Sequence, residues 1–134
     1  MSWLIIASIV FGVVMLVLLS LFGKKYHPKM KQKRFQQEWT AILERVKTPE
    51  GMVLAVIDAD KLLDQALKRH NFRGKTVGEK LVASQRILSD NDGAWHAHKL
   101  RNRLVHEPNI RLKKSECQSA LAGFKQALKD LGAL

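Results

Sequence analysis

Residues 95–108 read W-H-A-H-K-L-R-N-R-L-V-H-E-P and combine a helical pattern with most of the chemistry in the chain. Just upstream, Asp90, Asn91 and Asp92 offer side-chain oxygens that can cap the first turn of a helix. Pro108 disfavours helical geometry at the residue before it, so the helix should end before Glu107. The stretch therefore predicts one helix of about four turns.

Two groups of side chains lie on different faces of this helix. At about 100° per residue, Ala97, Leu100 and Leu104 fall on one face, which we expect to contact the core. The polar face recurs turn by turn and comprises His98, Asn102 and His106, with Arg101 at its near edge. A cation, an amide and imidazoles are therefore displayed together beside the core face.

The motif carries a resemblance to a known family. Arg101, the polar Asn102, three further residues and then His106 match the signature of the HEPN superfamily. The order A-D-K-L-L at residues 59–63, followed later by W-x-x-H-K-L-R-N from Trp95, is similar to a membrane-tethered group of HEPN-like proteins. The resemblance covers about residues 30–132.

This resemblance implies an up-and-down helical bundle that forms a homodimer, with the motif helices of the two subunits facing each other. Many HEPN domains are metal-independent endoribonucleases, whereas others have lost catalysis and serve as binding or scaffold modules. The toxin-like members imply an antitoxin or a nucleotidyltransferase as a partner. We expect no cofactor.

The motif residues have the chemistry that RNA cleavage without a metal requires. An imidazole changes charge close to neutral pH, so His106 can act as base or acid, and Arg101 can hold phosphate through two donors. We expect Asn102 to position phosphate or ribose, His98 to assist, and Trp95 to stack a base. The family implies products that end in a 2′,3′-cyclic phosphate and a 5′-hydroxyl.

Each of these residues also has a structural interpretation. His106 can cap the helix C-terminus, and Trp95 can lie in the core or in the dimer interface. Asp60 lies about 40° off the core face of its own helix and needs a partner if it is buried. That partner is either Arg101 in an ordinary ion pair, or Arg101 or an imidazole that Asp60 orients for function. We expect no metal site, because His96 and His98 point about 200° apart on a helix.

The N-terminal segment predicts a transmembrane anchor over residues 1–23. Its apolar run has 20 residues without a charge, enough at about 1.5 Å per residue to cross a hydrocarbon core of about 30 Å. Trp3 lies at one expected interface and Tyr26 just beyond the other. A cleaved signal peptide is the competing interpretation, but the segment lacks a basic start and a small-x-small site.

A basic segment, residues 24–34, follows the anchor. Its cations predict a cytoplasmic location for the body and attraction to anionic lipid; they are Lys24, Lys25, Lys29, Lys31, Lys33 and Arg34. RNA is another polyanion that the segment would attract. The chain has 23 basic and 12 acidic residues, a net charge of +11. Without these six cations the excess falls to 5, so the body is only modestly basic.

We predict an all-α fold in which residues 35–134 form one bundle of four to five amphipathic helices. Beside the motif helix, the expected helices cover residues 30–46, 48–70, 76–88 and 114–131. Thr48 before Pro49 and the pair Thr76 and Glu79 are helix starts, and Gly132 ends the last helix. The first of these helices has an apolar face made by Phe35, Trp39, Ile42, Leu43 and Val46. The single Cys117 excludes an internal disulfide and agrees with a reducing compartment.

The sequence thus predicts a membrane-anchored HEPN-like protein that cuts RNA, with Arg101 and His106 as catalytic residues. One alternative is a catalytically silent module that binds RNA, nucleotide or a protein partner at the membrane. A second alternative is a structural adaptor, in which Arg101 and His106 would be dispensable.

Overall fold

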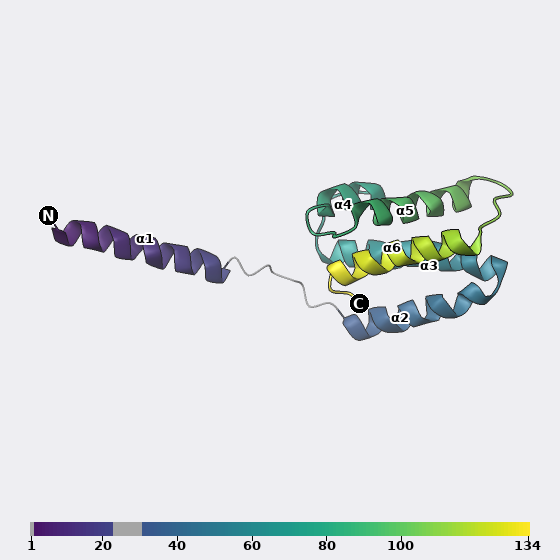
Figure 1. Cartoon of the computed structure of the whole chain (residues 1–134), viewed down its shortest axis with the longest axis horizontal. Coiled ribbons are helices and arrows are strands. Elements are labelled where there is room, and N and C mark those ends of the chain that lie inside the picture. Colours follow the sequence, from purple (N-terminus) through teal and green to yellow (C-terminus); the bar gives the residue numbers. More distant parts are fainter. Residues whose placement is uncertain (1, 23–30) are drawn as a thin grey trace.

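The computed structural model describes residues 2–22 and 31–134 (Figure 1). Every regular element in these ranges is helical, which confirms the predicted all-α fold. The elements are α1 (Ser2–Phe22), α2 (Gln32–Glu44), the short 3₁₀ helix η1 (Arg45–Lys47), α3 (Pro49–Arg69), α4 (Val77–Ser84), α5 (Asn91–His106) and α6 (Lys114–Asp130). The five helices from α2 onward form the predicted bundle.

α1 is long and apolar enough to cross a membrane over Ser2–Leu21, and none of that span is buried against other parts of the chain. Within the described ranges it contacts none of the bundle helices. Large apolar side chains are exposed all around it, among them Leu4, Phe11 and Leu16. A helix with this surface needs an apolar environment of its own. Of the predicted flanking residues, Lys24, Lys25, Tyr26 and Lys29 lie outside the described residues.

Successive long helices of the bundle alternate in direction (Figure 1). α3 packs against α2, α5 and α6, and α6 also packs along α5. The short α4 contacts α3 and α5 and lies where α3 ends and α5 begins. The core between these helices includes fully buried side chains from four of them, Phe35, Leu63, Leu81 and Phe124.

Three predicted helix starts are confirmed by their hydrogen bonds. The Thr48 hydroxyl accepts from the Gly51 N–H at 3.0 Å, and Pro49 occupies the first position of α3. The Thr76 hydroxyl accepts from the Glu79 N–H at 3.2 Å, and Glu79 completes the capping box of α4. Asp90 accepts from the Gly93 N–H at 2.9 Å and caps α5. Short polar side chains therefore define where these helices begin.

Two details of the expected helices were wrong. α4 ends at Ser84 and does not continue to Leu88, because the Asn91 amide donates to the Gln85 carbonyl at 2.8 Å and satisfies that end of the helix. Leu43 is 42% exposed, whereas Phe35, Trp39 and Ile42 of the same predicted face are buried. Leu43 lines a pocket between α2 and α6 instead of the core.

Gly123 sets the distance between α5 and α6. A Cβ atom at this position would overlap the backbone carbonyl group of Gly93. The first turn of α5 therefore rests directly on the backbone of α6, with no side chain between the two helices at that point. This close approach helps to fix the position of α5, which carries the motif.

Candidate functional site

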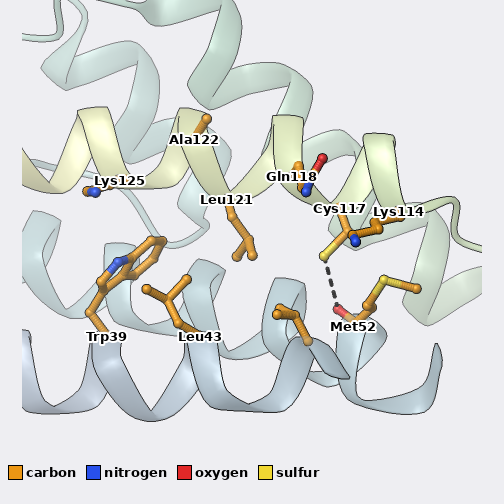
Figure 2. A pocket seen from close by; sticks show the side chains of 10 residues that line it. Trp39, Leu43, Met52, Lys114, Cys117, Gln118, Leu121, Ala122 and Lys125 are labelled. Atoms are coloured by element: carbon orange, nitrogen blue, oxygen red, sulfur yellow. Dashed lines mark hydrogen bonds between the residues drawn. The ribbon is translucent and has the colours of Figure 1, made fainter. Parts of the chain in front are cut away.

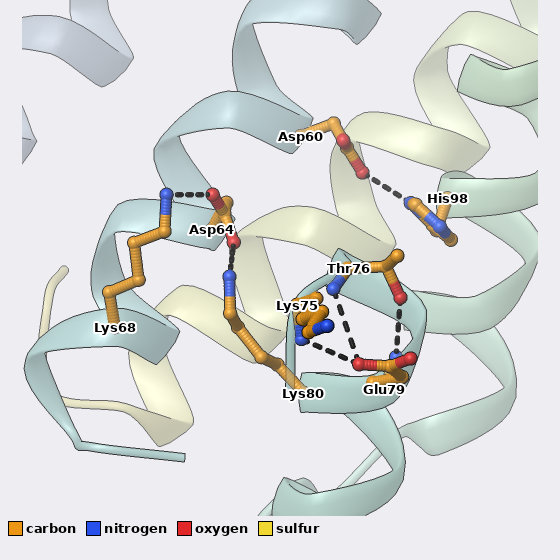
Figure 3. A network of polar contacts seen from close by, with 8 residues as sticks. All are labelled: Asp60, Asp64, Lys68, Lys75, Thr76, Glu79, Lys80 and His98. Carbon is orange, nitrogen blue, oxygen red and sulfur yellow. Dashed lines mark hydrogen bonds and ion pairs between the residues drawn. The ribbon is translucent and has the colours of Figure 1, made fainter. Parts of the chain in front are cut away.

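The site is built around Asp60, a carboxylate of α3 that is only 2% exposed. Its Oδ1 accepts a hydrogen bond from the Nδ1 of His98, on α5, at 2.7 Å (Figure 3). His98 is itself 8% exposed. Asp60 is therefore buried, as predicted, and its partner is an imidazole of the motif helix. That Asp60 orients this imidazole for function stays a prediction. The expectation that His98 is displayed on an open polar face is wrong, because α3 covers it.

Two further contacts extend this pair to Arg101. The Nε2 of His98 lies 3.3 Å from the Asn102 side-chain nitrogen, and the Asn102 oxygen accepts from the Arg101 Nη1 at 2.9 Å. The Nε of Arg101 lies 3.5 Å from the second oxygen of Asp60. That distance supports an ion pair but is long for a hydrogen bond. The four side chains therefore form a closed ring between α3 and α5.

The polarity of the ring assigns one protonation state to His98. A carboxylate only accepts hydrogen bonds, so the imidazole proton lies on Nδ1 and points to Asp60. Nε2 is then free to accept from the Asn102 amide, which leaves the Asn102 oxygen for Arg101. A neutral His98 with this tautomer satisfies every contact in the ring, and each member orients the next.

Arg101 keeps donors that the ring does not use. Its side chain is 27% exposed, and within the described residues its only hydrogen bond is the one from Nη1 to Asn102. A guanidinium has five N–H donors in a fixed fork. The Nε–H is buried without a hydrogen-bond partner, but the outer edge of the group reaches solvent. Arg101 is thus held from inside while its outer edge stays available to an anion.

His106 lies outside the ring. It is exposed in the last turn of α5 and, in the part of the chain that the structure describes, has no hydrogen bond or ion pair. Five residues along a helix correspond to a rise of about 7.5 Å and a rotation of about 140°. Arg101 and His106 of one chain therefore do not face each other across a single cleft. The predicted cap role for His106 has no hydrogen bond to support it either.

Trp95 packs at the edge of the ring. Its indole meets the His98 ring edge-on, with centroids 6.1 Å apart and an interplanar angle of 72°. It also lies over Gly78 of α4, where an added Cβ would be 3.4 Å from the indole. The other side of Trp95 lines an open surface hollow with Asp92, His96 and Lys99. One part of the Trp95 side chain thus packs against His98 and Gly78, and another part lies at the surface.

A separate cluster of charged side chains lies around Asp64, one turn further along α3 (Figure 3). Asp64 contacts the Lys80 ammonium at 2.6 Å and the Lys68 ammonium at 2.7 Å. Burial raises the pKa of Asp64, but the hydrogen bonds and charges of Lys68 and Lys80 outweigh this effect and hold the pKa below its usual value. Lys80, on α4, is only 4% exposed, and the sequence did not predict that this lysine is buried. The sequence analysis did not predict this cluster.

The described residues contain no group of three or more His, Cys, Asp or Glu side chains that could hold a metal ion. Comparison with protein families, curated proteins and solved structures finds no match to this chain.

Proposed function

We propose that this chain is a membrane-anchored, HEPN-like endoribonuclease that cuts RNA without a metal. The observation that carries the proposal is the presentation of Arg101, whose guanidinium is held by Asp60 and Asn102 while its outer edge reaches solvent. A pre-positioned guanidinium is suited to a phosphate whose negative charge increases during reaction. His106, exposed on the same helix, supplies a group that can move a proton near neutral pH.

The reaction follows from these groups. One imidazole removes the proton of a ribose 2′-hydroxyl, and the 2′-oxygen attacks the adjacent phosphorus. The bond from phosphorus to the 5′-oxygen breaks as a second imidazole gives that oxygen a proton. Arg101 stabilises the added charge on the phosphate oxygens. The products are a 2′,3′-cyclic phosphate and a 5′-hydroxyl. This step is an internal transesterification and needs no water.

The separation of Arg101 and His106 on one helix makes a homodimer part of the proposal. When two copies pack with their α5 helices facing each other, the His106 of one chain approaches the Arg101 of its partner. Two imidazoles are then available for the two proton transfers, whereas one chain supplies only one exposed motif histidine. His98 and Asn102 act as positioning residues because their side chains bond to each other and to Asp60 and Arg101.

We further propose that α1 crosses the bilayer with its N-terminus outside, so that the bundle works on the cytoplasmic side. The cations that follow α1 set this orientation and attract anionic lipid. Lys31 and Lys33 are exposed, but Arg34 is paired with Glu38 at 2.7 Å and contributes less. A neighbouring antitoxin or nucleotidyltransferase is the protein partner that this function would need for control.

The test uses the full chain in phosphatidylcholine nanodiscs, single-stranded RNA and excess chelator. Wild type should release fragments with cyclic phosphate ends. His106→Ala should lower the rate by about 10²-fold to 10⁴-fold and Arg101→Ala by about 10²-fold to 10³-fold. The matched controls are His96→Ala and Arg103→Ala, which change exposed residues of the same type on the same helix. Loss of cleavage in the controls, or its persistence in both motif variants, would contradict the proposal.

The closed ring gives weight to one alternative, a silent module that binds RNA or nucleotide. His98 and Asn102 use their hydrogen-bonding groups on protein partners, which suits a fixed anion-binding surface as well as it suits catalysis. RNA binding without cleavage, weakened by Arg101→Ala and unchanged by His106→Ala, would select this function. Unchanged behaviour of both variants in the cell would select the structural adaptor.

A further inference from the structure

A pocket separate from the ring opens between α2, η1, the start of α3 and α6 (Figure 2). Its volume is about 320 Å³, near the lower end of the range of about 300 to 1,000 Å³ that small-molecule sites occupy. Neither Arg101 nor His106 lines it. An inference from this pocket is therefore independent of the proposed nuclease.

The inner wall of the pocket is apolar. It is made by Trp39, Leu43, Val46, Met52 and Leu121. Cys117 also belongs to this wall, and burial raises the pKa of its thiol, so the group stays protonated and uncharged. The indole Nε1 of Trp39 is buried without a hydrogen-bond partner, and Trp39 is 6% exposed. The wall thus suits an aliphatic chain and has almost no polar group that could recognise a base or a sugar.

The polar side chains of the pocket all come from α6. Lys114, Gln118 and Lys125 are exposed and, at their helical spacing, lie along one edge of the opening. No acidic residue lines the pocket. Neither lysine ammonium has a carboxylate partner or a hydrogen bond among the described residues, and residues 23–30 contain no Asp or Glu. Two uncompensated positive charges therefore stand beside an apolar cavity.

We propose that this pocket binds a single acyl chain with an anionic head group. The chain lies against Trp39, Met52 and Leu121, and the head group pairs with one of the two lysines, Lys114 or Lys125, which stand at opposite ends of the opening about 16.5 Å apart along α6. Fatty acids and lysophospholipids share this chemistry. α2 begins ten residues after α1 ends, and ten residues span at most about 35 Å. A chain anchored in a bilayer therefore keeps the pocket close to a supply of such lipids.

The charge of the rim argues against a second copy of the chain as the occupant. In a two-fold contact the same surface meets itself. Lys114 and Lys125 of both copies would then come together with no acid on the rim to offset them. An anionic ligand removes this repulsion and a second copy increases it.

The experiment measures quenching of Trp39 by fatty acids that carry bromine at the end of the chain. It uses the full chain in phosphatidylcholine nanodiscs with Trp3→Phe and Trp95→Phe, so that Trp39 is the only fluorophore of its kind. ω-Bromododecanoate should quench it saturably, and the affinity should rise about tenfold for each two methylenes added from octanoate to dodecanoate. ω-Bromododecanol, which lacks the charge, should bind at least tenfold more weakly. A lysophosphatidate of the same chain length, added as a competitor, shows which head group binds more tightly.

The double variant Lys114→Gln/Lys125→Gln should weaken the carboxylate at least tenfold and leave the alcohol unchanged. Both side chains are exposed and unpaired, so the thermal unfolding midpoint should not fall. Lys129→Gln removes one charge from an exposed position of the same helix outside the pocket and should change nothing. Ala122→Trp, at the exposed rim, should block binding of both ligands.

Three results would overturn the proposal. The first is quenching that rises linearly with ligand, as partitioning into the bilayer alone would give. The second is equal affinity for carboxylate and alcohol, or equal effects of Lys129→Gln and the double variant. The third is protection of Trp39 by self-association of the chain in the absence of any lipid ligand.

Discussion

Asp60 and Asp64 are the same residue type, one turn apart on α3, and yet their partners and their burial differ. Asp60 is 2% exposed and bonds to a neutral imidazole, with a guanidinium at 3.5 Å. The side chain of Asp64 is 20% exposed and pairs with the flexible side chains of Lys68 and Lys80. Figure 3 shows Asp60 with His98, and Asp64 with Lys68 and Lys80.

The difference lies in what the partners do next. Lys80 ties α4 to α3 and passes no constraint to a third helix residue, because its ammonium contacts only Asp64 among the described residues. His98 has a second ring nitrogen, so the orientation set by Asp60 is passed to Asn102 and then to Arg101. A lysine ends a network of contacts, whereas a histidine and an amide continue it. The Asp60 ring is therefore linked to Arg101 of the candidate site, whereas the Asp64 cluster only joins α4 to α3.

The largest expected effect comes from Asp60→Ala. The change leaves His98 and Arg101 without their buried acceptor, and breaking a buried pair costs about 3 to 5 kcal/mol. Urea unfolding of the full chain in nanodiscs, followed by near-UV circular dichroism, measures the free energy. Asp64→Ala is the matched control and should cost less, because the stems of Lys68 and Lys80 can carry their charges to water. A larger loss of unfolding free energy in Asp64→Ala than in Asp60→Ala would contradict this difference between the two clusters.

A smaller effect is expected from His98→Leu, about 1 to 3 kcal/mol, because the Asp60 oxygen and the Asn102 amide lose their partner. Lys80→Met, the corresponding change in the other cluster, should cost under about 1.5 kcal/mol, since Asp64 keeps Lys68. The same unfolding measurement applies. RNA cleavage per folded molecule should fall in His98→Leu and stay unchanged in Lys80→Met. Equal cleavage in the two variants would mean that the ring does not position Arg101.

The pH dependence of stability should be smaller still and should come from Asp64. Its pKa is lowered in the folded state by Lys68 and Lys80, so its contribution is complete above the unfolded value of about 3.9 and is lost as the pH falls through the folded value. Thermal midpoints recorded from neutral pH down into this range should therefore fall more steeply for wild type than for Asp64→Asn. Parallel curves for the two proteins would show that the two lysines give Asp64 no net stabilisation.

The smallest effect should come from Arg34→Gln on α2. Arg34 pairs with Glu38 at 2.7 Å, but the two side chains are 55% and 37% exposed. Exposed pairs at this spacing contribute about 0.3 to 0.5 kcal/mol. The unfolding midpoint should move by little more than its error. A loss as large as that of His98→Leu would mean that burial does not distinguish these contacts.

The helix starts could be predicted from sequence because their chemistry is local. Thr48, Thr76 and Asp90 each bond to a backbone N–H three residues later. The end of α4 could not be predicted, because it depends on Asn91, which belongs to the next helix. Boundaries set by neighbours in the chain can be read from the pattern, and boundaries set by another element cannot.

The same distinction applies to the site. Periodicity placed Asp60 near the core and predicted the polar arc of α5, but the rotation of α5 against α3 decides which members of that arc are covered. That rotation buries His98 and leaves His106 in solvent. The pocket beside Leu43 was missed altogether, since it is formed by four segments whose separate patterns indicate only core.

The close approach of Gly123 to Gly93 limits which residues position 123 can accept. Any side chain at position 123 would act as a wedge at the first turn of α5 and tilt the motif helix away from α6. Gly12 in α1 has nothing within 4 Å of where a side chain would begin. A saturation library should therefore return glycine alone at position 123 and many apolar residues at position 12. The distance between α5 and α6 therefore depends on the absence of a side chain at position 123.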